Sequence, residues 1–226
     1  MTIADRLAEV AGRIAAACER AGRDPSEVKL VSVAKTFAAD RVREALAAGA
    51  VAIGENRAQE LKEKAAALGG DIEWHFVGHL QTNKVRQVVG VAALIHSVDR
   101  YGLAEAIARR ARSLDLVQDV LIEVNIAGEA TKGGIEPRKA SAFAAEVDAL
   151  AGVRVIGLMA MAPFADDPEV SRPFFRDLAE IGAVVRAELS GAMALSMGMT
   201  RDFEVAIEEG ATLVRVGEAI FGPRTR

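Results

Sequence analysis

Residues 29–36 read KLVSVAKT, an apolar run that ends in a lysine and a threonine. Seven further short apolar runs follow it along the chain, and stretches with helical periodicity separate most of them. Runs that are apolar at nearly every position are typical of parallel strands buried on both faces beneath helices. The predicted strands are residues 29–36, 51–56, 74–80, 94–99, 119–125, 154–161, 192–198 and 213–217.

The intervening segments favour a (β/α)8 barrel. Pro137 and Pro168 suit first helical turns, and Gly49 suits the position after a helix end. Eight strand–helix units in about 200 residues match a small TIM-type barrel of the α/β class. A doubly wound open sheet is the alternative, but it more often has five or six strands. The predicted helices are residues 39–48, 57–68, 100–112, 137–150 and 168–189, with an extra N-terminal helix within 1–22 packed outside the barrel.

Composition excludes several classes of protein. The chain has 226 residues and a formal net charge of -4, and its basic and acidic residues are interspersed, which argues against nucleic-acid binding. No uncharged apolar run reaches the ~18 residues that a membrane-spanning helix needs. The lone cysteine, Cys18, excludes an intramolecular disulfide. We therefore expect a single cytoplasmic domain over residues 1–226, present as a monomer.

Lys35 is the first candidate functional residue, because barrels carry their function at the carboxyl ends of the strands. Alternation puts Val31, Val33 and Lys35 on one face of the first strand. A lysine drawn into a barrel mouth loses basicity, and the neutral amine is the form that condenses with an aldehyde. Position alone equally allows a lysine that extends outward from the barrel rim.

A candidate phosphate site follows strands seven and eight. Strand seven ends in Ser196-Met-Gly198-Met-Thr200 before a helix expected near residues 201–202, and strand eight ends at Gly217. Loops in these two positions commonly bind phosphate in barrels. Ser196 and Thr200 offer hydroxyl groups, and the glycines allow a phosphate to approach the main chain. An ordinary loop with a threonine cap is the alternative. Lysine and loop together indicate a phosphorylated aldehyde.

Arg215 is the third candidate, since alternation points it into the barrel with Leu213 and Gly217. A buried arginine keeps its charge and needs an acceptor. That acceptor is either a carboxylate such as Glu55 or Glu123, or a ring nitrogen of a bound cofactor.

The remaining motifs carry weaker signals. His75 and His79 lie too far apart along a strand to share a metal, and neither has a ligand cluster around it, so we expect no metal site. His96 is interpreted as a core histidine. Gly133-Gly134, after Thr131-Lys132, is either a lid or a flexible connection.

Seven segments of this chain resemble the pyridoxal-phosphate homeostasis proteins. They run in family order from the first strand to the last, which makes the resemblance specific. One departure is KGGI at 132–135, where many relatives have a serine in place of the first glycine. The segments are VAKT (33–36), GENRAQE (54–60), HFVGHLQTNK (75–84), EVN (123–125), GLMAM (157–161), LSMGMTRD (195–202) and VRVGEAIFG (214–222).

The resemblance implies a barrel like the N-terminal domain of alanine racemase, with pyridoxal 5′-phosphate attached to Lys35 as a Schiff base. It also implies that Asn56 lies near the cofactor's face and that Arg215 faces the pyridine nitrogen. The phosphate would be held by Ser196, Gly198, Thr200 and Gly217. Family members are regarded as carriers or regulators of vitamin B6 supply without an established turnover, so no catalytic residue is assigned, and cofactor-dependent apo-enzymes are the expected partners.

Three functions remain open from the sequence. The first is a protein that buffers or delivers pyridoxal phosphate. The second is a pyridoxal-phosphate enzyme such as an amino-acid racemase, although the only tyrosine, Tyr101, begins a predicted helix. The third is an aldolase that uses Lys35 on a phosphosugar, which gives Arg215 no evident role.

Overall fold

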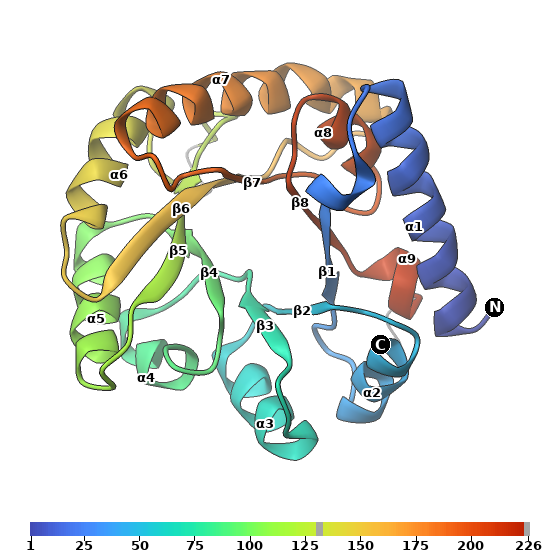
Figure 1. The fold of residues 1–226 in the computed structure, drawn as a ribbon, viewed down its shortest axis with the longest axis horizontal. Coiled ribbons are helices and arrows are strands. Elements are labelled where there is room, and N and C mark those ends of the chain that lie inside the picture. Colours follow the sequence, from blue (N-terminus) through green and yellow to red (C-terminus); the bar gives the residue numbers. More distant parts are fainter. Residues whose placement is uncertain (130–132, 224–226) are drawn as a thin grey trace.

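The computed structural model describes residues 1–129 and 133–223. In this part of the chain, eight parallel strands form one closed barrel in sequence order, and β8 pairs with β1 to close it. Figure 1 shows the helices as an outer layer around the strands. The predicted barrel is thereby confirmed, and the open sheet is excluded. The strands are β1 (Lys29–Val33), β2 (Ala52–Glu55), β3 (Glu73–Phe76), β4 (Leu94–Val98), β5 (Gln118–Val124), β6 (Val153–Ala160), β7 (Ala194–Ser196) and β8 (Leu213–Val216).

The helical layer contains all the predicted helices and several short ones that the sequence did not indicate. The segments predicted to begin at Pro137 and Pro168 start as 3₁₀ turns, at Pro137–Lys139 and Pro168–Ser171, before continuing as α6 and α7. The helices are α1 (Ile3–Arg20), α2 (Ala39–Ala47), α3 (Ala58–Leu68), α4 (Val85–Val88), α5 (Tyr101–Arg112), α6 (Ala140–Asp148), α7 (Arg172–Glu188), α8 (Phe203–Glu208) and α9 (Glu218–Phe221). Within the described residues, none of them is long and apolar enough to cross a membrane.

Helix α1 begins with a capping box, in which Thr2 and Asp5 each bond the other's main-chain N–H through their side chains. Its buried stripe, which includes Leu7, Val10 and Ile14, lies on the outside of the barrel. Figure 1 shows α1 alongside α8 and α9, at the point where the first and last parts of the chain meet. The expectation of an extra N-terminal helix is confirmed.

The barrel interior is separate from the core between strands and helices. Its apolar cluster follows the alternation expected of strands and comprises Val31, Val33, Ala52, Leu94, Leu121, Met159 and Leu213. Several predicted strands are shorter than expected because their last residues leave the ladder to form turns. Thus β1 ends at Val33, and Ala34 O accepts a hydrogen bond from Phe37 N in a turn that contains Lys35.

Candidate functional site

The carboxyl ends of β1, β2 and β8 bring three predicted site residues together. Lys35 is half-buried and follows β1 by two residues. Val33 pairs with Gly54 of β2, and Asn56 directly follows the end of β2, so the segments that carry Lys35 and Asn56 leave the barrel at neighbouring strand ends. On the other side of β1, a Cβ atom on Gly217 would lie 2.9 Å from Val33 O. Lys35 therefore lies between the ends of the neighbouring strands that carry Asn56 and Gly217.

The turn that carries Lys35 is held on both sides by helix α3. Lys64 Nζ donates a hydrogen bond to Ala34 O at 2.9 Å, and Glu60 Oε2 accepts one from Thr36 N at 2.8 Å. Thr36 has a φ of 70°, which costs a β-branched residue about 1–3 kcal/mol. The surrounding contacts maintain this strained backbone, which suggests that the orientation of Lys35 is important.

Glu55 completes the support of this turn from the helix-facing side of β2. Its Oε1 accepts a hydrogen bond from Lys64 Nζ at 2.5 Å, and its Oε2 has no hydrogen-bond partner among the described residues. Glu55 is fully buried, and this burial outweighs the effect of Lys64 and raises the pKa of Glu55 to about 7. Glu55 therefore partners Lys64, not Arg215, and sequence reasoning missed Lys64 and Glu60 entirely.

The loop after β7 forms a close-packed turn with unused main-chain donors. No hydrogen bond within residues 1–129 and 133–223 engages the N–H groups of Gly198, Thr200 or Gly217. Gly198 has a φ of 86°, and a Cβ atom there would lie 2.6 Å from Ala206 Cβ and 2.8 Å from Phe203 Cα. Only glycine suits this position, because a side chain would collide with α8.

Two side chains fix this loop from behind. Asp202 Oδ1 accepts a hydrogen bond from Met199 N at 2.7 Å, and its Oδ2 accepts one from Ser171 Oγ at 3.2 Å.

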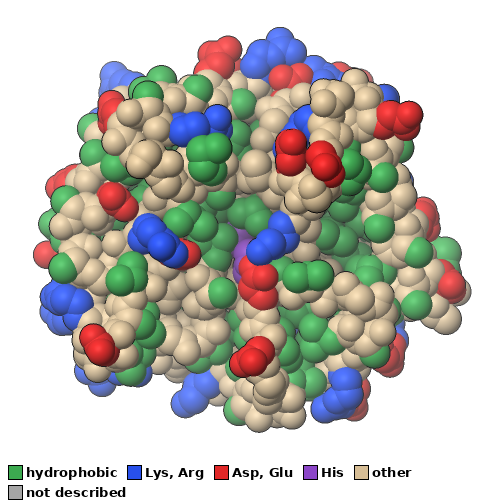
Figure 2. Space-filling view, in the orientation of Figure 1, with side chains coloured by type: hydrophobic (Ala, Val, Ile, Leu, Met, Phe, Trp, Pro, Cys, Tyr) green, Lys and Arg blue, Asp and Glu red, His purple; other side chains and the backbone are tan. Residues whose placement is uncertain are grey.

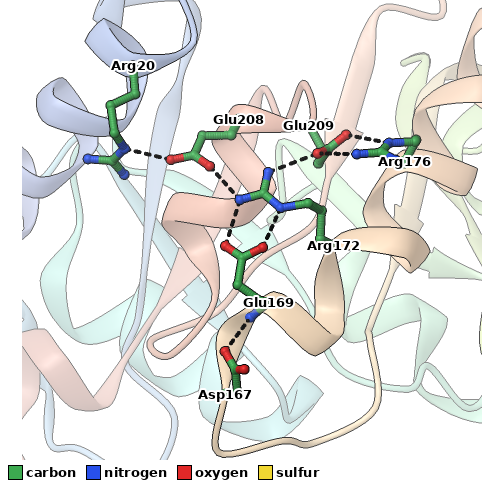
Figure 3. A network of polar contacts seen from close by, with 7 residues as sticks. All are labelled: Arg20, Asp167, Glu169, Arg172, Arg176, Glu208 and Glu209. Atoms are coloured by element: carbon green, nitrogen blue, oxygen red, sulfur yellow. Dashed lines mark hydrogen bonds and ion pairs between the residues drawn. The ribbon is translucent and has the colours of Figure 1, made fainter.

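Figure 3 shows a wider ion-pair network at the start of α7 and the end of α8. At its centre, Arg172 pairs with three carboxylates, which together raise its pKa. They are Glu169 at 2.6 Å, Glu208 at 2.7 Å and Glu209 at 2.9 Å.

Arg215 and Ser196 lie inside the barrel and are bonded to each other. Arg215 Nη1 donates to Ser196 Oγ at 2.6 Å and to Ser196 O at 2.8 Å, while its Nη2 donates to Ala160 O at 3.0 Å. Ser196 is fully buried, and its hydroxyl also contacts His96 Nδ1 at 2.9 Å. Of the predicted phosphate ligands, Gly198, Thr200 and Gly217 lie in the loops, whereas the Ser196 hydroxyl is engaged in the interior.

Glu123 is a buried carboxyl group on β5 that sequence reasoning considered only as a partner for Arg215. The two residues form no ion pair in the described part of the chain, but the charge of Arg215 acts on Glu123. Burial, assisted by Asp99, outweighs that attraction and raises the pKa of Glu123 to about 7. The burial of Arg215 itself lowers the pKa of the guanidinium to about 10, which leaves it cationic at neutral pH.

A hollow of about 280 Å³ opens beside Asn56. Arg57, His79 and Lys84 line it, and the arginine and the lysine bring positive charge to it. The hollow therefore extends the candidate site from Asn56 towards β3.

The glycine loop after β5 is partly anchored. Ile135 N donates to Glu123 O at 2.7 Å, and Asn125 N donates to Ile135 O at 2.9 Å, so Ile135 is bonded to the end of β5. Thr131 and Lys132 lie outside the described residues. Lys132 is the first residue of the KGGI segment that departs from the family pattern. Among the residues that the structure does describe, no three His, Cys, Asp or Glu side chains gather as metal ligands.

The fold and the site define a barrel with a lysine in a restrained turn and, nearby in the fold, a glycine loop with unused main-chain amides. The comparisons with known proteins agree with this fold. Residues 6–225 match the family described as alanine racemase, N-terminal domain, and the chain belongs to it and, within it, to the pyridoxal phosphate homeostasis proteins. A protein of that name from Aquifex aeolicus is 48% identical over 226 residues, which cover 99% of each chain.

Two solved structures illustrate the relationship. PipY of Synechococcus elongatus, with PLP bound, has a TM-score of 0.84 and 35% identity, and the match covers 98% of this chain and 100% of that one. Alanine racemase of Clostridium difficile has a TM-score of 0.76 at 15% identity, and the match covers 98% of this chain and 58% of that one. The second similarity concerns the fold alone.

Proposed function

We propose that this chain binds pyridoxal 5′-phosphate on Lys35 as a Schiff base and serves cofactor homeostasis by holding or delivering it. The observation that carries the proposal is the restrained Lys35 turn next to β8, whose end at Gly217 has an unused main-chain amide, as does the loop after β7. Relatives that match over nearly their full length are named pyridoxal phosphate homeostasis proteins, which supports the same function.

The residues present fit a phosphorylated aldehyde. The N–H groups of Gly198, Thr200 and Gly217 can donate to phosphate oxygens, and the space that a Cβ atom would fill at Gly198 is taken by α8. When bound, the cofactor supplies an aldehyde for an amine and a ring that withdraws electrons. Lys35 would hold the aldehyde carbon, and Asn56 would border the ring.

Arg215 bears on how strongly a bound cofactor could act as an electron sink. A cationic guanidinium that faced the pyridine nitrogen would keep it unprotonated and would make the ring a weaker electron sink than a carboxylate would, although arginine and aspartate both serve as this partner in PLP enzymes. Arg215 has five N–H groups. Three of them donate to neutral oxygens, which are Ser196 O, Ser196 Oγ and Ala160 O, so two remain to donate elsewhere.

Racemase-like turnover is the second candidate, and one observation favours it. Racemisation needs a base on each face of the substrate's α-carbon, and Lys35 supplies one. Tyr101 begins α5 and is partly exposed. Glu123, whose side chain faces the barrel interior and whose pKa is raised to about 7, can take or release a proton near neutrality.

The test of the main proposal is borohydride reduction of the purified, cofactor-loaded protein, followed by mass spectrometry of its peptides. We expect a pyridoxyl group on Lys35. A label on another lysine, or the absence of a visible absorption band, would refute the assignment and leave a phosphosugar aldolase to be examined.

The test of the second candidate is incubation with L-alanine and other amino acids, followed by chiral chromatography. We expect little or no turnover. Turnover of about 1–1,000 per second is the usual enzyme range. Turnover in this range would establish an enzyme if both Glu123→Gln and Lys35→Ala abolished it.

We further propose that the protein is a cytoplasmic monomer and that its partners are cofactor-dependent apo-enzymes.

A further inference from the structure

A hydrogen-bonded series of buried polar side chains runs through the interior of the barrel, where most of the other side chains are apolar. His75, His96 and Ser196 are each at most 1% exposed, and Arg215 is 5% exposed. At the opposite end of the chain lies Glu73, the first residue of β3, which pairs with the exposed Lys29 at the start of β1. Figure 2 shows the centre of one face of the barrel, where a small area of histidine is visible within a largely hydrophobic hollow.

The contacts along this chain are continuous. Starting from the exposed end, Lys29 Nζ donates to Glu73 Oε1 at 2.7 Å. Further inward, His75 Nε2 lies 2.9 Å from Glu73 Oε1, and His75 Nδ1 lies 2.9 Å from His96 Nε2. His96 Nδ1 lies 2.9 Å from Ser196 Oγ, which accepts a hydrogen bond from Arg215 at 2.6 Å. The side chains thus link the amino-terminal end of the barrel to the candidate site.

The two ends of the chain fix the direction of its hydrogen bonds. Arg215 can only donate, so Ser196 Oγ accepts from it and is free to donate its own hydrogen to His96 Nδ1. At the other end, Glu73 can only accept, because its bonds to His75 and Lys29 lower its pKa to about 2. His75 must therefore carry its proton on Nε2.

One proton on each ring completes the chain. Burial holds the pKa of His96 well below its usual value, so that ring is neutral. Lys29 already balances the charge of Glu73, so a second cation on His75 would add net charge to the barrel interior. With both rings neutral, His96 Nε2–H donates to His75 Nδ1, and every hydrogen bond points from Arg215 towards Glu73.

We propose that a hydrogen-bond chain holds the Arg215 guanidinium in place. It runs through Ser196, His96, His75 and Glu73, and all its bonds donate in the same direction, towards Glu73. His96 is then a positioning residue, because it keeps the Ser196 hydrogen away from Arg215 and leaves the oxygen lone pairs for the guanidinium. The chain of bonds is a property of the unliganded protein, whereas its role towards a pyridine ring rests on the function proposed above.

The first experiment is long-range ¹⁵N–¹H NMR of the histidine rings in the unliganded protein at neutral pH. The protein has three histidines. The third, His79, has a side chain that is 58% exposed, and it serves as an internal reference. We expect both His75 and His96 as neutral rings protonated at Nε2. An imidazolium at His75, or a proton on Nδ1 of either ring, would overturn the proposal whether or not the protein binds the cofactor.

The second experiment measures how well the protein distinguishes pyridoxal phosphate from the benzene analogue that has CH in place of the ring nitrogen. In His96→Phe and Ser196→Ala, we expect this preference to fall about ten-fold, as for one lost charge-assisted hydrogen bond. Affinity for the analogue should stay within about two-fold, well below the effect of one such bond. Glu105→Gln, an exposed change on α5, is the control.

The outcomes of the second experiment separate the explanations. Equal losses for both ligands would mean that Ser196 and His96 act on the phosphate or on the fold in general, and would overturn the positioning role. An unchanged preference in both variants would overturn it as well. Failure of the wild-type protein to bind either ligand would refute the proposed function, while the NMR result would still decide the hydrogen-bond chain.

Discussion

The two halves of the candidate site are held by different kinds of interaction. The Lys35 turn is held by charged side chains of α3 and β2, with Lys64 bonded to Ala34 O and Glu60 to Thr36 N. The loop after β7 is held largely by close packing, with Gly198 in contact with α8. The first half should therefore respond to changes of charge and pH, and the second to changes of side-chain volume.

The largest expected effect concerns the reactive group itself. Lys35→Ala should abolish the covalent attachment of the cofactor completely, yet leave measurable binding, because the loop amides do not involve the lysine. Mass spectrometry after borohydride reduction measures the first effect, and equilibrium dialysis the second. If the variant loses all binding, the two halves of the site do not act separately and the comparison fails.

The packed half should be sensitive to a single methyl group. In Gly198→Ala, the positive φ and the contact with Ala206 should together lower the free energy of unfolding by about 2–4 kcal/mol. Gly210→Ala is the matched control, since Gly210 has a φ of 100° but open space around it. Urea denaturation of both variants separates strain from overpacking, and equal losses would contradict the packing argument.

The charged half should be sensitive to pH. The folded protein raises the pKa of Glu55 from 4.5 to about 7, so the folded state binds the extra proton. This contribution to stability is complete below pH 4.5 and is lost as the pH rises to about 7. Glu55→Gln should therefore flatten the decline in unfolding free energy between these values by on the order of 2 kcal/mol. A Glu105→Gln control should keep the wild-type slope, and a wild-type slope in Glu55→Gln would show that Glu55 titrates normally.

The smallest expected effect tests the amides after β7 and β8. Pyridoxal without its phosphate should bind at least about ten-fold more weakly than the phosphorylated form, because a dianion gains charge-assisted hydrogen bonds from these amides. Fluorescence titration of Lys35→Ala with each ligand isolates this effect from the covalent bond. Equal affinities for the two ligands would show that the amides after β7 and β8 do not bind the phosphate.

The barrel was predictable from the sequence because buried parallel strands have a nearly continuous apolar pattern. The strand ends were less predictable, since Ala34, Lys35 and Thr36 read as strand but form a turn whose shape depends on α3. Short helices such as α4, with four residues, are too brief to show periodicity.

The place of the candidate site was predictable, because Lys35 and the loop glycines lie at the carboxyl ends of the strands as the sequence indicated, and their roles stay predictions. Ser196 was predicted to bind phosphate, but its hydroxyl is bonded to His96 and Arg215. A signal was present, because alternation places His75, His96, Ser196 and Arg215 on the inward faces of their strands. Which inward groups touch one another depends on the stagger of the barrel, and a single sequence does not contain that information.

The contact of α1 with α8 and α9 has a consequence for how the chain folds. Arg13 pairs with Glu204 and Arg20 with Glu208 across 191 and 188 positions of sequence. Contacts between such distant residues form slowly, because the intervening chain must first be brought into place. During synthesis, the apolar stripe of α1 and the open edge of β1 stay exposed until the last strand and helices have emerged, and such surfaces make an incomplete chain prone to aggregation.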